Sequence, residues 1–170
     1  AVSPTASRSD APRLSRWTAC AYAGGVGIHI GTSGWSYDHW RGVLYPAGTP
    51  SAKRLEAYVA AFDTVELNAS FYRWPPDTMF ASWRDRVPPG FLFTVKAPRG
   101  LTHARKLTSP EVWAPRIERG MRALGDRAGF LLLQLPPDLE RDDARLDAAL
   151  AALAPIAPLA VELRHPSWNA

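Results

Sequence analysis

The sequence predicts an α/β fold of the TIM type, a (β/α)₈ barrel of which this chain holds an incomplete N-terminal portion of about five βα units. Short apolar runs alternate with amphipathic stretches, which is the order of parallel strands joined by right-handed helical crossovers. Polar residues recur on one face of each run, and a barrel interior can hold them. A doubly wound sheet is the alternative, but the first run lacks its glycine-rich dinucleotide turn.

Each apolar run is short enough for a buried strand, and turn residues bound most of the runs. The predicted strands are 27–32, 63–68, 91–96, 129–134 and 159–164. In the first of them, alternation points Ile28 and Ile30 outward toward covering helices, and His29 and Gly31 inward.

Apolar residues at helical spacing occupy the stretches between the strands. The predicted helices are 51–62, 77–86, 110–124 and 142–153. Asp77 and Ser109 are expected N-caps, and Pro110 suits the first helical position. Trp83 and Trp113 lie on these helices, so we expect both of them in the core.

Two strands carry a glutamate at the same place in their pattern, Glu66 in 63–68 and Glu162 in 159–164. A carboxylate in an apolar strand costs free energy unless it is paired, hydrogen-bonded or needed for function. Since alternate side chains of a strand point to opposite faces, both glutamates are predicted to face the barrel interior.

Further polar residues are predicted to face inward near the carboxyl ends of the strands. They are Asn68, Lys96, Gln134 and Arg164. Active sites of TIM-type barrels lie at that end, in the mouth formed by strand ends and the following loops. Glu66–Lys96 and Glu162–Arg164 could instead be internal ion pairs, which add little net stability.

The loops after the strands supply further candidate substrate-binding side chains. These are Trp35, Tyr72, Arg99, His103, His165 and Trp168. Trp35, Tyr72 and Trp168 could form a stacking wall for a sugar ring or a base, or could simply cover the end of the barrel.

Several strings of this chain, in order and at natural spacing, also match a known family. They are Gly31–Tyr37, Trp40–Gly42, Tyr45–Pro46, Thr64–Tyr72, Phe93–Pro98, His103, Gln134–Pro137 and Val161–Trp168. Over residues 28–168 the chain resembles the YecE-like family, catalogued as domain of unknown function number 72. The resemblance implies a bacterial, cytoplasmic TIM-type barrel and no particular activity. Because family members are longer, we expect this chain to be a fragment lacking about three βα units.

The first functional hypothesis is an enzyme of the hydrolase or isomerase type. Glu66 and Glu162 would share acid/base work as catalytic residues, with their pKa values separated by neighbouring cations. Lys96 and Arg164 would hold a small anionic or sugar-like substrate at the mouth.

The alternative is a non-catalytic binding module for nucleic acid or another anionic ligand. Arg73, Arg99, Arg105 and Lys106 lie on the predicted mouth loops between Trp and Tyr residues, a composition typical of single-strand grooves. The formal net charge of only +4 is too small to support nucleic-acid binding by electrostatics alone.

No cofactor is predicted, although a divalent metal stays an alternative. Residues of metal-ligating types in the predicted site are His29, Glu66, His103, Glu162 and His165. No short ligand-spacing motif joins them, and the neighbouring cations disfavour a metal ion.

Composition sets the remaining expectations. The 170 residues, 46% hydrophobic and 21% charged, suffice for one globular domain, here residues 27–170. Residues 1–26 are expected to be a disordered leader or linker. No apolar run approaches the ~20 residues that span a bilayer, so no membrane partner is predicted. Cys20 is the single cysteine, which fits a reducing compartment and a cytoplasmic location.

Overall fold

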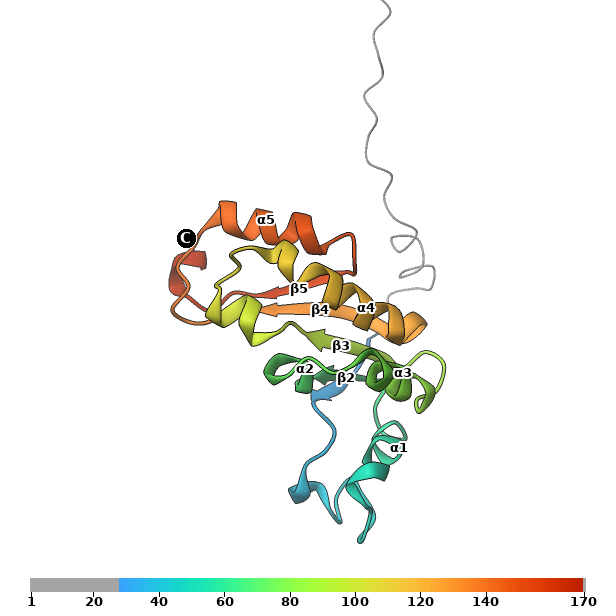
Figure 1. Ribbon diagram of the computed structural model, residues 1–170. Coiled ribbons are helices and arrows are strands. Elements are labelled where there is room, and N and C mark those ends of the chain that lie inside the picture. Colours follow the sequence, from blue (N-terminus) through green and yellow to red (C-terminus); the bar gives the residue numbers. More distant parts are fainter. Residues whose placement is uncertain (1–27, 170) are drawn as a thin grey trace, which may run out of the picture.

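A five-stranded parallel sheet in the order β1-β2-β3-β4-β5 forms the centre of the computed structural model, which describes residues 28–169 (Figure 1). The strands are β1 (Gly31–Ser33), β2 (Thr64–Leu67), β3 (Leu92–Lys96), β4 (Ala128–Gln134) and β5 (Leu159–Glu162). The predicted α/β class and parallel sheet are therefore confirmed. The strand order shows no reversal, which a doubly wound sheet would require. Within the described residues the sheet is not closed, because β1 and β5 are its edges.

Helical segments connect the strands. The α-helices are α1 (Arg54–Tyr58), α2 (Ala69–Tyr72), α3 (Asp77–Asp85), α4 (Ala114–Leu124) and α5 (Asp143–Leu153). Shorter turns are η2 (Asp38–Trp40), η3 (Ser51–Lys53), η4 (Gly100–Ala104), η5 (Pro110–Val112), η6 (Gly125–Arg127) and η7 (Pro166–Asn169). The leader expected at residues 1–26, with Cys20, lies outside the described residues.

The predicted helices are present, but two of them are divided and the expected N-caps differ. The stretches 51–62 and 110–124 each divide into a 3₁₀ turn followed by an α-helix. Pro76, and not Asp77, is the N-cap of α3, since Asp77 already belongs to the helix. Ser109 precedes η5 in a left-handed conformation and makes no side-chain capping bond there.

The prediction for the first strand was wrong in its extent. β1 begins at Gly31 instead of residue 27, and Ile28 and Ile30 are 85% and 65% exposed instead of packed under helices. The backbone nitrogen of Ile30 donates to the side chain of Asp63 at 2.9 Å. Strand pairing starts one residue later, at Gly31 with Thr64.

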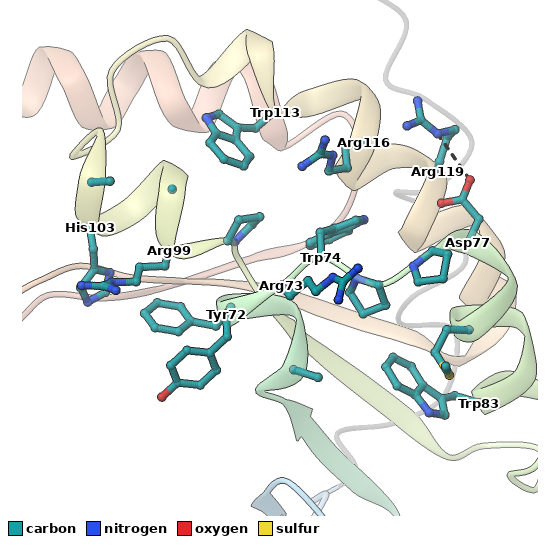
Figure 2. Close-up of a pocket in the computed structure, with 18 residues that line it drawn as sticks. Tyr72, Arg73, Trp74, Asp77, Trp83, Arg99, His103, Trp113, Arg116 and Arg119 are labelled. Atoms are coloured by element: carbon teal, nitrogen blue, oxygen red, sulfur yellow. Dashed lines mark ion pairs between the residues drawn. The ribbon is translucent and has the colours of Figure 1, made fainter.

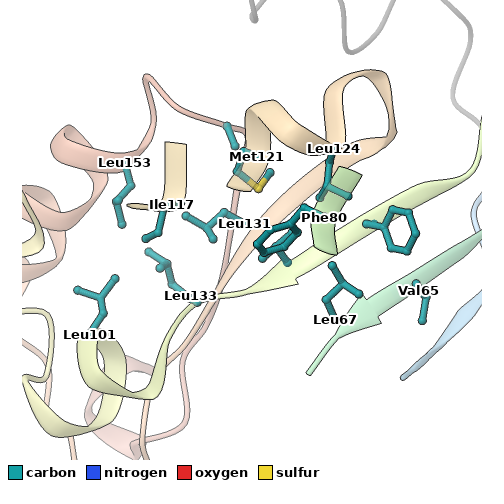
Figure 3. Close-up of a cluster of buried hydrophobic side chains, with 14 of the residues drawn as sticks. Val65, Leu67, Phe80, Leu101, Ile117, Met121, Leu124, Leu131, Leu133 and Leu153 are labelled. Carbon is teal, nitrogen blue, oxygen red and sulfur yellow. The ribbon is translucent and has the colours of Figure 1, made fainter. Parts of the chain in front are cut away.

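The hydrophobic core lies between the sheet and α3, α4 and α5 (Figure 3). Val65 and Leu67 of β2 are fully buried, whereas Glu66 between them is half-buried. The same alternation continues in β3 and β4, as predicted. Trp83 is buried in this core as expected, but Trp113 is only half-buried. The helices thus cover one face of the sheet, and the polar residues belong to the other.

None of the helices in residues 28–169 is long and apolar enough to cross a membrane.

Candidate functional site

Glu66 is the centre of a hydrogen-bonded group at the end of β2. Ser33 Oγ donates to its Oε1 at 3.0 Å, and Lys96 Nζ lies 3.5 Å from the same oxygen. Asn68 Nδ2 in turn donates to Ser33 Oγ at 2.5 Å. The parallel register explains the grouping, because Ser33, Glu66 and Thr94 are direct partners across β1, β2 and β3.

A small cavity adjoins this glutamate. It has a volume of ≈ 310 Å³ and is lined by residues of β1, β2 and β3 together with His29. Glu66, Ser33 and Thr94 are among its polar lining residues. The volume is at the lower end of the range for small-molecule sites, so the glutamate faces space for a small ligand.

Glu162 is the centre of a second group, on β4 and β5. Gln134 Nε2 donates to its Oε2 at 2.5 Å, and Arg164 Nε donates to its Oε1 at 2.6 Å. Burial acts to raise the pKa of Glu162. The hydrogen bonds from Gln134 and Arg164 and the charges of Arg164 and Lys96 outweigh burial, so the pKa is lowered. Glu162 is thereby held as a carboxylate.

Lys96 connects the two groups. Its ammonium pairs with Glu66 and also contributes to the lowered pKa of Glu162. The ammonium also stands over the ring of Phe71, 5.2 Å from the ring centre. The lysine is only 12% exposed, so solvent screens these interactions weakly.

His103 also packs against Phe71, edge-on, with the two ring centres 4.9 Å apart. Burial lowers the pKa of His103, and the positive charges of Arg164, Arg99 and Lys96 lower it further. The imidazole is therefore biased toward its neutral form, with Thr102 Oγ1 2.9 Å from Nδ1. These shifts also indicate that the local electrostatic potential is positive.

The three aromatic candidates for a stacking wall have three different surroundings. Trp35 packs edge-on against Trp83, on the core side of the sheet. Tyr72 is 80% exposed beside Phe71. Trp168 Nε1 donates to the carbonyl of Leu139 at 3.0 Å. The described residues therefore do not form the wall that the sequence suggested.

His165 makes local contacts after β5. Its Nδ1 lies 2.8 Å from Ser167 Oγ and accepts a bond from the backbone nitrogen of Ser167 at 3.2 Å. The second contact assigns the ring proton to Nε2.

Arg99, His103 and Tyr72 line a second and larger cavity of ≈ 1370 Å³ (Figure 2). It extends from η4 along the α2–α3 loop to the first turns of α3 and α4. Trp74 and Trp113 supply much of its aromatic surface. The two cavities are separate, since they share no lining residue.

The candidate metal-ligating residues named above do not form one cluster in the described part of the chain. Within residues 28–169 no group of three or more His, Cys, Asp or Glu side chains could hold a metal ion. His29 instead pairs with Asp63 at 3.0 Å, near the start of β1.

Sequence reasoning missed two contributors to the site. Ser33 was assigned to a loop, although it continues the inward parity of Gly31 and bonds Glu66. Phe71 lies on the short helix α2, which the sequence analysis did not predict, and it contacts both Lys96 and His103. The strand pattern could have revealed Ser33, whereas no periodicity signals a helix of one turn.

Repeated βα units with carboxylates, amides and cations at the carboxyl ends of parallel strands define a class of α/β protein with its polar site on the strand ends. The sequence profile of the family described as "Protein of unknown function DUF72" matches residues 29–170. The chain belongs to this family, and the resemblance to YecE-like proteins is confirmed.

Curated relatives agree with this assignment. The chain is 33% identical over 150 residues to UPF0759 protein YunF of Bacillus subtilis, covering 83% of this chain and 52% of YunF. It is 30% identical over 144 residues to UPF0759 protein YecE of Escherichia coli K12, covering 84% of this chain and 50% of YecE. The chain thus spans about half the length of the curated relatives it matches.

Solved structures of the family share the fold. A DUF72 family protein from Thermotoga maritima (TM1631) matches with a TM-score of 0.69 and 33% identity, over 84% of this chain and 57% of that one. A DUF72 family protein from Enterococcus faecalis (EF0366) matches with a TM-score of 0.57 and 22% identity, over 71% and 51%. The second match concerns the fold alone.

Proposed function

We propose that this chain forms part of a TIM-type barrel whose carboxyl-end mouth is the active site of an acid/base enzyme. The reaction would be of the hydrolase or isomerase type, on a small anionic or sugar-like substrate. The sequential strand order supports the barrel, because a barrel adds each βα unit beside the last. The cytoplasm is the compartment we propose, on the basis of the single cysteine.

The position of Lys96 carries the proposal. Its ammonium lies 3.5 Å from Glu66 and also acts on Glu162, so two carboxylates from distant strands share one cation. A purely structural interior would be more stable with apolar side chains. Carboxylates held in different surroundings are what acid/base chemistry requires.

The roles follow from the hydrogen bonds. Glu162 stays ionised because Gln134 and Arg164 stabilise its carboxylate, so it would act in its charged form and not as the general acid. His103, biased toward neutral imidazole, can accept a proton from a ligand at the mouth. Glu66 faces the ≈ 310 Å³ cavity and would contact the substrate directly.

The positive charge of the proposed mouth favours an anionic substrate. Besides burial, the charges of Arg164, Arg99 and Lys96 lower the pKa of His103, and they outweigh the opposing charge of Asp138. An anionic group such as a carboxylate or phosphate would be attracted to this positive potential, and an arginine can bind it through two hydrogen bonds.

The test is an activity screen of the full-length protein with glycosides, phosphate esters and sugar phosphates. For any substrate that is turned over, Glu66→Gln and Glu162→Gln should each lower kcat by about 10²- to 10⁴-fold. Glu118→Gln, on the exposed side of α4, is the matched control and should leave kcat unchanged. Full activity in both site variants would refute the assignment.

A further inference from the structure

The larger cavity is a groove built by residues of a single stretch of chain, 69–119. Figure 2 shows Trp113 and Arg116 on one side and Tyr72 and Arg73 on the other, with Trp74 between them. Its volume of ≈ 1370 Å³ exceeds what one drug-sized ligand usually fills. The acid/base site described above lies outside it, apart from Phe71, Arg99 and His103 at one end.

Two glycines fix the aromatic walls. A Cβ atom at Gly120 would lie 2.7 Å from Trp74 Cζ2, so the indole packs directly on the backbone of α4. A Cβ atom at Gly100 would lie 2.3 Å from Trp113 Cη2, so the second indole rests on η4 in the same way. Both rings are therefore held in place before any ligand arrives, which lowers the entropy cost of binding.

Three of the four arginines that line the groove have no carboxylate partner within the described residues. In residues 28–169 most arginines pair with an acid, as Arg54 does with Asp38 and Arg86 with Glu56. The arginines of this part of the chain without an ion pair are Arg73, Arg99, Arg105 and Arg116. All of them except Arg105 line the groove.

The one acid among the lining residues does not neutralise these cations. Asp77 Oδ2 lies 3.4 Å from Nε of Arg119, which also lines the groove. Arg73, Arg99 and Arg116 therefore keep their positive charge available to a ligand, in a groove whose walls are flat aromatic rings.

We propose that this groove binds nucleotide phosphates, with a base stacked on Trp74 or Trp113 and the phosphates held by Arg73, Arg99 and Arg116. Base stacking on aromatic side chains and phosphate binding by arginine are the usual elements of such sites. The shared chemistry, a planar base joined to a phosphate, comes from a free nucleotide or from a single strand, and a volume of ≈ 1370 Å³ has room for more than one unit. The proposal does not depend on the acid/base reaction.

The test is calorimetric titration of the full-length protein at low salt. The probes are AMP, adenosine, ribose 5-phosphate, inorganic phosphate and a short oligothymidylate. AMP or the oligonucleotide should bind at least about tenfold more tightly than adenosine, ribose 5-phosphate and phosphate, because only they offer both elements. Preference for AMP identifies a free nucleotide, and preference for the oligonucleotide identifies a single strand.

Variants locate the site. Arg73→Ala and Arg116→Ala should each weaken binding by about tenfold, since each removes a charge-assisted contact. Arg105→Ala is the matched control, because this arginine is equally unpaired but lies outside the groove. Glu66→Gln should also leave binding unchanged, which separates this proposal from the enzymatic one.

Three outcomes would overturn the proposal. One is no binding of AMP or the oligonucleotide at about 1 mM. The second is binding of phosphate alone as tight as that of AMP, which would remove the base from the argument. The third is an equal loss of affinity in Arg105→Ala and Arg73→Ala, which would show unspecific attraction to surface charge.

Discussion

Gln134 Nε2 donates a 2.5 Å hydrogen bond to Glu162 Oε2, and the two residues are direct partners in the register of β4 and β5. The amide occupies one carboxylate oxygen while Arg164 occupies the other. Both bonds favour the ionised form, so Gln134 tunes the acidity of its neighbour without carrying a charge.

Replacing this amide should therefore change the titration of Glu162. In Gln134→Leu, the pKa of Glu162 should rise toward its ordinary value, because burial remains and one stabilising hydrogen bond is lost. Carboxyl ¹³C NMR of the full-length protein measures the shift, and Glu162→Gln assigns the resonance. An unchanged pKa would show that Arg164 and Lys96 set the acidity without Gln134.

The lowered pKa of Glu162 also predicts how stability depends on pH. A carboxyl group whose pKa is lower in the folded state binds fewer protons there, so it stabilises the fold above its unfolded value of 4.5. This contribution is lost as the pH falls through the folded pKa.

Urea denaturation at a series of acid pH values checks this. Glu162→Gln should show a shallower loss of stability below pH 4.5 than the parent protein. The difference should be less than about 1 kcal/mol, because the side chain is 42% exposed and solvent screens its charges. A steeper loss in the variant would contradict the sign of the shift.

Lys96 and Glu66 allow a test of whether their ion pair exists for stability. Lys96→Met should lower the free energy of unfolding by about 1–2 kcal/mol, since it leaves the half-buried Glu66 without its cation. The double variant Glu66→Gln/Lys96→Met should recover to within about 1 kcal/mol of the parent. If the double variant instead stays as unstable as Lys96→Met, the pair contributes to the stability of the fold.

Tyr58 ties β1 to the rest of the sheet. Its hydroxyl accepts a 2.8 Å bond from the backbone nitrogen of Thr32 and donates a 2.9 Å bond to the carbonyl of Thr64. Tyr58→Phe should lower the free energy of unfolding by about 1–3 kcal/mol, because both backbone groups lose a partner. Tyr72→Phe, at an exposed tyrosine, is the control and should stay within about 0.5 kcal/mol.

Gly120 tests the wall of the groove. In Gly120→Ala, the new methyl group would lie 2.7 Å from Trp74 and 2.9 Å from Phe80, so the indole must move. We expect a loss of about 1–3 kcal/mol in thermal or urea unfolding, despite the better helix propensity of alanine. Indole fluorescence should shift as well. Arg122→Ala on the exposed side of α4 should change neither signal.

The inward and outward faces of β2 to β4 were predictable because strand alternation has a period of two residues and the helices bury one face. The start of β1 was not predictable, because the backbone nitrogen of Ile30 donates a hydrogen bond to the side chain of Asp63 on a neighbouring turn. The close contacts of Glu66 with Lys96 and of Glu162 with Arg164 follow from that parity, and the sequence analysis named both as the alternative to a catalytic site. Sequence alternation alone does not choose between an ion pair and a catalytic pair.

The groove was harder to predict from the sequence. Its arginines were visible on the loops, but Arg116 lies on a helix face, and no pattern reveals which arginines lack a carboxylate partner. That property depends on the packing of α3 and α4, and so does the seating of Trp74 on Gly120. Sequence periodicity identifies buried faces, whereas unpaired charges emerge only from the tertiary structure.

The hydrogen bonds around Glu66 distinguish its two carboxylate oxygens. Ser33 Oγ and Lys96 Nζ both contact Oε1. Because Ser33 Oγ accepts a hydrogen bond from the amide of Asn68, its own hydroxyl proton is donated to the glutamate. Among the described residues no side chain is found to donate to Oε2, so a ligand of Glu66 would meet this oxygen without displacing Ser33 or Lys96. In the acid/base reaction proposed above, Oε2 would then be the oxygen that exchanges the proton.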